Sequence, residues 1–294
     1  MKGPASGRLR LATRGSPQAL TQARAVAHAI TLTTGLDAEL IPIKTTGDRD
    51  QSVALHTIGG QGVFVKEIQQ AVLDGRADIA VHSAKDLPSE TPAGLVIGAF
   101  CERRDPADGL IGSTLTGLPN GATVATGSVR RRAQLAAERP DLSFVELRGN
   151  IARRLEQIPE RGAIVMAVAA LEVLGMTELI AERLDPARFV PAVGQGCVAV
   201  ECRDGDGATA AALAVIDDAP TRHAVVVERA FLRELGSGCS LPVGAHCDGS
   251  VLHAFLAGES GDVFRARRDV EGDTDAAAAT AAALAINARD AVGA

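Results

Sequence analysis

Aromatic residues are scarce: the sequence has no tryptophan, no tyrosine and only seven phenylalanines. Proteins that bind single-stranded nucleic acid stack bases on aromatic rings, and those that bind duplexes carry a clustered positive charge. Here the net charge is −6, so the composition argues against a nucleic-acid partner. Of the 30 basic residues only four are lysine. We therefore expect anions to be recognised locally, by a few arginines in an otherwise acidic protein.

Long hydrophobic runs and paired cysteines are also missing. The sequence has no uncharged apolar stretch of about 18 residues, and residues 1–17 contain no continuous apolar segment. We therefore expect a cytoplasmic protein with no membrane partner. The five cysteines are odd in number and include no C-x-x-C pair, which argues against a disulfide framework and against a metal site.

Segments with strand character alternate with helical segments through the first two-thirds of the chain. This alternation is typical of an α/β protein with largely parallel sheets. The strand over 9–13, for example, leads to Ser16 and Pro17, an N-cap residue and a first-turn proline for the helix that follows. A loop rich in glycine and aspartate is expected after residue 202. Beyond about residue 220 the pattern changes, and we expect a small α+β domain.

Basic and hydroxyl residues recur where predicted strands end and helices begin. In open α/β sheets ligands bind at this edge. Guanidinium groups bind carboxylates through paired hydrogen bonds, so such a collection suits a ligand with several carboxylates. A single arginine is more often solvated or paired on the surface, and the pattern alone leaves both interpretations open. The junction residues are Arg14, Ser16, Thr126, Ser128, Arg130, Arg131, Arg148, Gly149, Asn150 and Arg154.

Two further segments combine reactive side chains with loop-like sequence. Lys85 and Asp86 follow the apolar strand over 77–83, where a carboxylate can stabilise a developing cation or move a proton. A surface ion pair is the alternative for these two residues. Cys239 lies in a glycine-flanked loop after a helix, which predicts an accessible and nucleophilic thiol. The alternative for Cys239 is a small buried side chain, as expected for the other cysteines.

Seven segments taken together resemble the porphobilinogen deaminase family, whose members are also called hydroxymethylbilane synthases. They occur in family order over residues 8–248, and so many ordered motifs are far more specific than any one of them. The segments are LRLATRGSPQALTQA (9–23), GGQGVFVKE (59–67), ADIAVHSAKDLP (77–88), SVRRRAQL (128–135), ELRGNIARRL (146–155), PAVGQGCVAVECR (191–203) and SGCSLPVGAH (237–246).

The resemblance implies a transferase of tetrapyrrole biosynthesis. Such an enzyme joins four porphobilinogen molecules head to tail, releases ammonia at each step and yields hydroxymethylbilane. Growth occurs on a dipyrromethane cofactor, which the resemblance places in thioether linkage to Cys239. It also implies that Asp86 is the catalytic carboxylate, because loss of ammonia leaves a cationic azafulvene-like intermediate. A nearby carboxylate stabilises this cation by facing the pyrrole N–H groups.

Each porphobilinogen carries an acetate and a propionate, so the growing chain accumulates carboxylates. The resemblance assigns the binding of these groups to residues at the strand ends, with Gln22 and Gln195 as weaker candidates. The implied cofactor and substrate contacts are Arg14, Ser16, Lys85, Thr126, Ser128, Arg130, Arg131, Arg148, Gly149 and Arg154.

The resemblance also implies a fold. It predicts two α/β domains, like those of periplasmic binding proteins, around a cleft, plus a small α+β third domain that carries the cofactor cysteine. We expect domain 1 over 8–101 with a return over 197–216, domain 2 over 102–196 and domain 3 over 220–294. The family further implies a monomer.

Three positions depart from the family pattern. Gln61 replaces a lysine of the glycine-rich loop, Thr57 stands where lysine is frequent, and Val173 lies near a position that is commonly arginine. Losing such a cation weakens carboxylate binding by about 1–3 kcal/mol per charged hydrogen bond. Arg132 adds a charge that would offset part of the loss. An activity-impaired paralogue, acting as an anionic-ligand-binding module, is therefore the alternative to a working enzyme.

Overall fold

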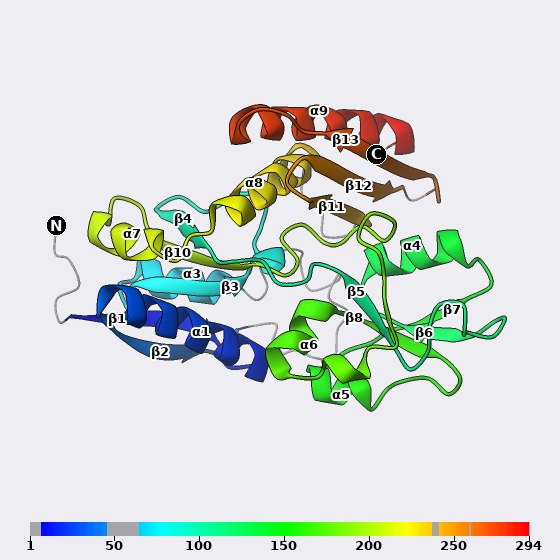
Figure 1. Cartoon of the computed structure of the whole chain (residues 1–294), viewed down its shortest axis with the longest axis horizontal. Helices are drawn as coiled ribbons and strands as arrows, with labels where there is room; N and C mark the ends of the chain where they lie inside the picture. Colours follow the sequence, from blue (N-terminus) through cyan, green and yellow to red (C-terminus); the bar gives the residue numbers. More distant parts are fainter. Residues whose placement is uncertain (1–6, 46–64, 237–240, 259, 294) are drawn as a thin grey trace. The chain divides into compact units, whose positions relative to one another are not determined.

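The described residues form three β-sheets (Figure 1). The computed structural model describes residues 7–45, 65–236, 241–258 and 260–293. These residues form two compact units. The first unit combines the described part of 1–104 with 197–222, and the second combines 105–196 with the described part of 223–294. The predicted boundary between a second and a third domain, inside the second unit, stays a prediction.

The first unit contains a five-stranded sheet with the order β2-β1-β3-β10-β4. Strand β1 pairs in parallel with β2 and β3, whereas β10 runs antiparallel between β3 and β4. Figure 1 shows this return of the chain as a yellow-green strand beside the cyan ones. The strands are β1 (Arg8–Arg14), β2 (Asp37–Ile43), β3 (Ile79–Ser83), β4 (Leu95–Phe100) and β10 (Val198–Arg203).

Helices cover both faces of this sheet. Side chains of α1 (Pro17–Thr34) and α7 (Gly207–Ala214) form a buried cluster with Leu9, Leu11 and other residues of one face. Side chains of α3 (Lys66–Leu73) pack with Ala12 on the other face. The side chains of neighbouring strand residues alternate between the faces, so a strand covered on both sides is apolar throughout. This arrangement explains why β3 begins with a continuous apolar run and why Leu9, Leu11 and Ala12 of β1 are all fully buried.

The second unit contains another five-stranded sheet, with the order β7-β6-β8-β5-β9. Strand β6 pairs in parallel with β7 and β8, and β5 runs antiparallel to β8 and β9. The elements are β5 (Asp108–Ile111), β6 (Thr123–Ala125), α4 (Val129–Glu138), β7 (Ser143–Val145), α5 (Ile151–Leu155), β8 (Ala163–Ala167), α6 (Val168–Leu174), the 3₁₀ turn η2 (Thr177–Leu179) and β9 (Glu182–Arg183).

A three-stranded antiparallel sheet, ordered β11-β12-β13, completes the second unit. Its buried cluster joins apolar residues of the sheet with Phe231 of α8 and Leu284 of α9. The elements are α8 (Ala219–Glu234), β11 (Val243–Cys247), β12 (Val251–Ala257), β13 (Val263–Asp269) and α9 (Thr274–Val292). The predicted fold class, two α/β sheet domains and a small third α+β part, is confirmed.

Two elements were not predicted from the sequence. After the short turn of Asp and Gly residues that follows β10, residues 207–214 form helix α7, which Asp206 caps by accepting a hydrogen bond from Thr209 N at 3.1 Å. The five alanines among its eight residues supply the helix propensity that the neighbouring glycines concealed. The second is strand β5, which begins at Asp108 in a stretch whose charged and turn-forming residues give no strand signal.

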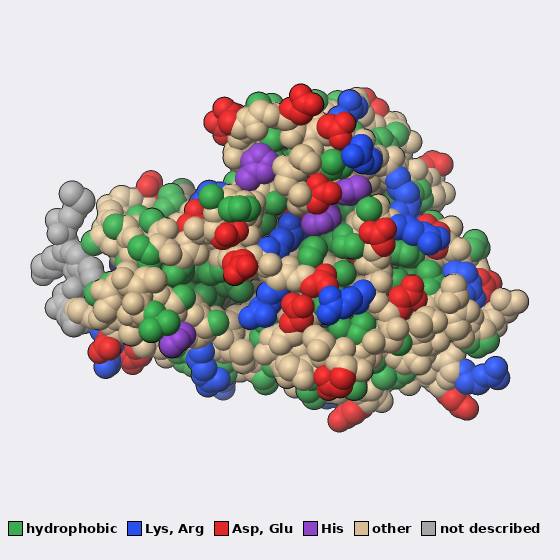
Figure 2. Space-filling view, viewed as in Figure 1, with side chains coloured by type: hydrophobic (Ala, Val, Ile, Leu, Met, Phe, Trp, Pro, Cys, Tyr) green, Lys and Arg blue, Asp and Glu red, His purple; other side chains and the backbone are tan. Residues whose placement is uncertain are grey.

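The surface mixes charges of both signs. Figure 2 shows acidic and basic side chains interspersed on the face in view, in keeping with the net charge of −6. No helix in the described part of the chain has the length and apolar character needed to span a bilayer.

Candidate functional site

Two predicted ligand-binding residues lie at the carboxyl end of β1. Arg14 is the last residue of the strand and is half-buried. Ser16 is the N-cap of α1: its Oγ accepts a hydrogen bond from Ala19 N at 3.3 Å, and Pro17 follows at the first helical position. Because β1 and β3 are parallel neighbours, their carboxyl ends meet at one edge of the sheet. The sequence prediction of this strand-to-helix junction is confirmed.

The carboxyl end of β3 contributes the second group of predicted residues. Ser83 ends the strand and donates from Oγ to Gln22 Oε1 at 3.1 Å, which brings Gln22 of α1 to the same edge. The chain then turns through a single 3₁₀ turn, η1 (Ala84–Asp86), closed by a hydrogen bond from Leu87 N to Ala84 O. Lys85 and Asp86 lie in this turn and are both half-buried.

The carboxylate of Asp86 has an unusual environment. Across the described residues, no N–H or O–H group donates a hydrogen bond to it and no cation lies within ion-pair distance. A carboxylate accepts up to about four hydrogen bonds, and burying one without donors costs free energy. A half-buried carboxylate without donors at a strand end is therefore suited to accept N–H groups from a ligand or to face a cationic one.

The second unit repeats the pattern at the carboxyl ends of β6 and β7. Thr126 and Ser128 follow β6, and Ser128 caps α4 by accepting a hydrogen bond from Arg131 N at 3.4 Å. Ser128 N in turn donates to Thr126 Oγ1 at 3.2 Å. After β7, the half-buried Arg148 and Gly149 precede α5, whose N-cap is Asn150. Strands β6 and β7 are parallel, so both junctions lie at one edge of the second sheet.

The junction after β7 is held in shape by its own hydrogen bonds. Arg154 Nε donates to Gly149 O at 2.8 Å, so this predicted contact braces the turn that precedes its helix. Gly149 has a φ of +104°, a backbone conformation that only glycine adopts without strain. The structure thus brings Arg148, Gly149 and Arg154 together in one turn.

Arg130 and Arg131, predicted as ligand contacts, share a buried carboxylate that the sequence reasoning missed. Arg130 Nη2 lies 2.8 Å from Asp108 Oδ2, and Arg131 Nη2 lies 2.7 Å from Asp108 Oδ1. Gln195, also a predicted contact, donates from its amide to Asp108 Oδ1 at 2.8 Å. Arg130 further donates to Val190 O at 2.7 Å. The network fixes the orientation of both guanidinium groups, and their predicted contacts with a ligand stay a prediction.

Burial and the neighbouring charges have opposite effects on the ionisation of Asp108 and Arg130. Burial opposes its ionisation, but the positive charges of Arg130 and Arg131 outweigh this effect and hold the pKa of Asp108 well below its usual range. Burial also lowers the pKa of Arg130, which the negative charge of Asp108 partly offsets. Asp108 stands in a charged, turn-rich segment of the sequence, so no local pattern distinguishes it from a surface aspartate.

Replacing Asp108 with asparagine is expected to destabilise the protein by about 3–5 kcal/mol at neutral pH, because two buried guanidinium groups lose their counter-charge. The pKa of Asp108 is lower in the folded protein than in the unfolded chain, where it is about 3.9. The ionised carboxylate therefore adds to the free energy of unfolding above about pH 3.9, and this added stability is lost as the pH falls below that value. The stability gap between the wild type and the variant should therefore narrow from pH 5 to pH 3. Urea denaturation at several pH values measures it, and a gap that is independent of pH would contradict this account.

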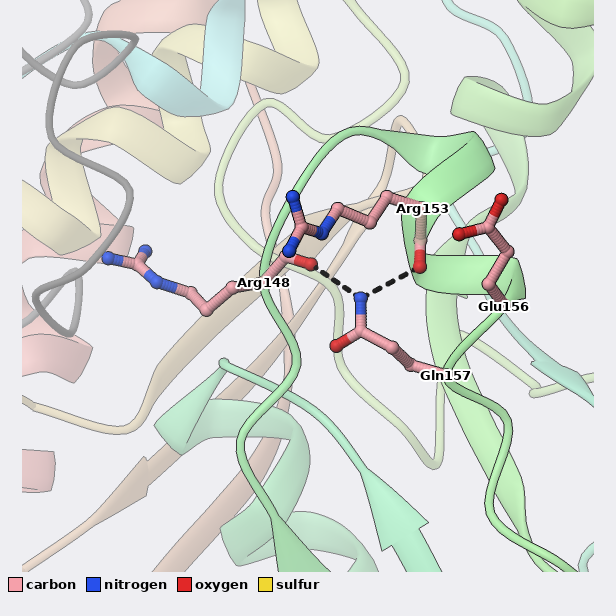
Figure 3. A pocket seen from close by; sticks show the side chains of 5 residues that line it. Arg148, Arg153, Glu156 and Gln157 are labelled. Carbon is pink, nitrogen blue, oxygen red and sulfur yellow. Dashed lines mark hydrogen bonds between the residues drawn. The ribbon is translucent and has the colours of Figure 1, made fainter.

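A pocket opens beside the turn after β7 (Figure 3). It has a volume of about 380 Å³ and is lined by Arg148, Gly149, Arg153, Glu156 and Gln157. Gln157 Nε2 donates to Arg148 O at 3.0 Å and to Arg153 O at 2.7 Å. Arg148 was predicted as a site residue, whereas Arg153 was not, because its position on the amphipathic segment 150–158 gives no signal that separates it from a solvated arginine.

Some predictions concern residues outside the part of the chain that is described. Cys239, Gln61 and Thr57 are in this group, and their roles stay predictions. Val173 lies in α6 and is half-buried. Among the described residues, no group of three or more histidine, cysteine, aspartate or glutamate side chains is arranged to hold a metal ion.

Comparison with known proteins identifies the family. Residues 9–211 match the domain described as "Porphobilinogen deaminase, dipyromethane cofactor binding domain", and residues 223–288 match "Porphobilinogen deaminase, C-terminal domain". The chain belongs to the porphobilinogen deaminase family. The resemblance noted in the sequence is thereby confirmed over nearly the whole described chain.

Curated relatives match at similar levels. Porphobilinogen deaminase of Syntrophotalea carbinolica is 46% identical over 247 residues, which cover 82% of this chain and 78% of the relative. Porphobilinogen deaminase of Nitratidesulfovibrio vulgaris is 46% identical over 245 residues, which cover 81% of this chain and 77% of the relative. That of Xanthomonas campestris pv. campestris is 45% identical over 277 residues, covering 91% of each chain.

Solved structures with a similar chain path include the methionine-binding protein MetQ, which is 13% identical, has a TM-score of 0.46 and covers 71% of this chain and 90% of its own. The VFT2 domain of Bordetella pertussis BvgS is 17% identical and has a TM-score of 0.41. The match covers 72% of this chain and 87% of that domain. The strand order and pairing, and not these distant likenesses, define the fold.

The described residues fit the cofactor of the family, which is a pair of linked pyrroles with acid side chains. A pyrrole offers N–H donors, and Asp86 offers a half-buried carboxylate without donors of its own. The acetates and propionates need cationic and hydroxyl partners, and the second sheet places Arg148, Thr126 and Ser128 at the ends of its parallel strands. The donor set therefore matches the chemistry of a dipyrromethane.

Proposed function

We propose that this chain condenses four porphobilinogen molecules head to tail, with loss of ammonia, to give hydroxymethylbilane for porphyrin biosynthesis. It is then a transferase that uses a covalently bound dipyrromethane. Membership of the porphobilinogen deaminase family supports this proposal. The structural observation that carries it is the half-buried Asp86 carboxylate, which has no hydrogen-bond donor among the described residues and lies in the turn after β3.

Asp86 acts on the charge that develops during each condensation. The aminomethyl C–N bond breaks and ammonia leaves, so a positive charge spreads over the pyrrole ring of the substrate. A C–C bond then forms to the free carbon of the receiving pyrrole, which afterwards loses its proton. The Asp86 carboxylate stabilises both cationic stages by accepting pyrrole N–H bonds, and its fixed place at the strand end avoids reorganisation. The bound dipyrromethane supplies the receiving carbon for the first unit.

The other predicted residues hold the acid side chains. Arginines bind carboxylates through two parallel hydrogen bonds, and hydroxyl groups add neutral donors. These roles were inferred for residues at the ends of parallel strands in both sheets, and Gln22 and Gln195 lie beside them through Ser83 and Asp108 respectively. The proposed contacts are Arg14, Ser16, Lys85, Thr126, Ser128, Arg130, Arg131, Arg148, Gly149 and Arg154.

The proposal also includes the cysteine that carries the cofactor, the location of the protein and its oligomeric state. Cys239 carries the dipyrromethane in a thioether, in the segment that matches the family motif SGCSLPVGAH. The protein acts as a cytoplasmic monomer without a membrane partner, as the family resemblance implies. Its acidic composition and lack of tryptophan and tyrosine argue against a nucleic-acid partner. Domain 3, over 220–294, then presents the cofactor cysteine.

Two measurements on the purified protein test the proposal. Its intact mass should exceed the sequence mass by one dipyrromethane. On incubation with porphobilinogen it should release ammonia and hydroxymethylbilane, which cyclises spontaneously to uroporphyrinogen I. A protein that binds porphobilinogen without releasing ammonia would instead be the anionic-ligand-binding module that the departures at Gln61 and Val173 raise as an alternative.

A further inference from the structure

A histidine–glutamate pair is buried in the first unit, and the proposed function gives it no role. His82 lies on β3 and Glu201 on β10, and the Nε2 atom of His82 is 3.0 Å from the Oε2 atom of Glu201. The two side chains are only 2% and 1% exposed. Burying a charged group costs free energy even when it is paired, so a pair kept in this position needs an explanation.

The two side chains meet across the ladder between β3 and β10. His82 is directly opposite Ala199, and Ala80 is directly opposite Glu201. Opposite residues of an antiparallel pair point to the same face of the sheet, and long side chains also reach diagonal neighbours. His82 and Glu201 therefore share the face on which Ala80 packs against apolar residues of α3.

A glutamine from α3 completes this buried cluster. The Nε2 atom of Gln69 donates to Oε1 and to Oε2 of Glu201, at 3.0 Å in each case. No lysine or arginine in the described part of the chain lies within ion-pair distance of Glu201. An unprotonated ring nitrogen so close to a carboxylate oxygen would bring two lone pairs together, so the His82–Glu201 pair holds a proton. The cluster thus satisfies its polar groups internally and links α3, β3 and β10.

The cluster lies immediately before the turn that carries Asp86. Ser83 follows His82 at the end of β3, and its Oγ donates to Gln22 of α1, at 3.1 Å. Side chains of neighbouring strand residues point to opposite faces of a sheet. The last two residues of β3 are therefore held from both faces, His82 by Glu201 and Ser83 by Gln22.

Asp86 depends on this anchoring, because its own carboxylate receives no hydrogen bond from the described residues. Its place is set by the backbone: by the 3₁₀ turn and by the hydrogen bond that Ala84 N donates to Cys197 O at 2.9 Å. A displacement of about 1 Å at a reacting group can cost about 100-fold in rate. A rigid cluster at the start of the turn therefore bears directly on turnover.

We propose that His82, held by Glu201 and Gln69, is a positioning residue for Asp86. It fixes the carboxyl end of β3, so that the Asp86 carboxylate meets the pyrrole N–H groups in one defined place. The inference rests on the proposed function and adds residues that are too deeply buried to contact a ligand. A buried polar cluster whose members are all satisfied makes the surrounding structure rigid and selects one arrangement of its elements.

His82→Phe tests the proposal, because it keeps a ring and removes the nitrogen that faces Glu201. It should lower kcat about 10- to 100-fold through misplacement of Asp86. The residues proposed to bind carboxylates are untouched, so KM should change less than about threefold, and the dipyrromethane should stay attached. His82→Gln keeps a donor for Glu201 and should recover most of the rate. Intact mass counts the cofactor-loaded protein, and steady-state assays with porphobilinogen give kcat per loaded protein.

The same substitution in an Asp86→Asn background separates positioning from a general structural effect. If His82 acts through Asp86, His82→Phe should lower kcat less than about threefold there, because the charge that it positions is already gone. His246→Phe is the matched control: His246 Nδ1 lies 3.5 Å from Oε1 of the buried Glu228, in the second unit. Any effect of this control on kcat should be equal in both backgrounds.

Equal fold losses for His82→Phe in the two backgrounds overturn the positioning role alone, as does an unchanged kcat in the folded variant. If His82→Phe does not fold, Gln69→Leu replaces it in the same cycle with the same expectations, because it removes only the amide that donates to Glu201. A wild type that makes no hydroxymethylbilane overturns the proposed function, and the inference with it.

Discussion

Replacing Cys239 with serine is expected to give a protein whose intact mass equals its sequence mass and which forms no hydroxymethylbilane. A thioether forms through a thiolate, which a thiol of pKa about 8.5 supplies in small amount at neutral pH and in larger amount beside positive charge. The serine hydroxyl stays protonated at that pH and is a much weaker nucleophile. The dipyrromethane therefore has no atom to which it can attach, and growth has no starting point.

Cys101→Ser is the matched control for this experiment. Cys101 is half-buried and is the most exposed of the cysteines that the structure describes. Burial raises the pKa of its thiol to about 11, and the nearby Asp217 and Asp218 add to the effect. The Cys101→Ser protein should therefore keep the added mass and the activity. If instead Cys239→Ser keeps the mass, the attachment site proposed here is wrong even if the protein remains active.

The other described cysteines are also expected to be unreactive. Cys197, Cys202 and Cys247 are buried, and burial raises the pKa of the Cys202 thiol. Buried thiols in apolar surroundings are inert compared with exposed ones near positive charge. The loss of added mass should therefore be specific to Cys239 among single cysteine-to-serine variants.

Much of the fold follows from short-range patterns. Residues 9–13 predict a strand, residues 77–83 predict a buried strand, and Ser16-Pro17 predicts the start of a helix, because each signal depends on neighbours in the sequence. Helix α7 and strand β5 were missed for the converse reason. The stability of each comes from packing against β4 or β8, which are distant in the sequence.

The residues of the candidate site likewise fall into those that local sequence patterns predict and those that they do not. Residues at a strand end or between a strand and the next helix, such as Arg14, Ser128 and Arg148, could be predicted because strand ends and helix starts are visible in the sequence. Asp108 could not be predicted, because its role depends on Arg130 and Arg131 approaching it from α4, more than 20 residues away.

Replacing Asp86 with asparagine is expected to lower kcat by at least about 100-fold while the dipyrromethane stays attached. Asparagine has nearly the same shape and keeps one oxygen acceptor, so the 3₁₀ turn after β3 should fold as before. It carries no negative charge, however, and so stabilises the cationic stages of each condensation far less. Removing one preorganised electrostatic partner from an active site costs about 10²–10³ in kcat. Steady-state assays with porphobilinogen measure the loss, and intact mass reports the cofactor.

Glu90→Gln separates this effect from a general loss of negative charge near the turn. Glu90 is exposed and lies four residues after Asp86, so its variant should turn over at the wild-type rate. In Asp86→Asn the substrate carboxylates keep their arginine partners, so KM should change much less than kcat. A variant with unchanged kcat would show that the carboxylate is structural. A variant that lacks the cofactor would show that Asp86 acts in loading the dipyrromethane rather than in extending it, because the charge would then be needed before the first porphobilinogen is added.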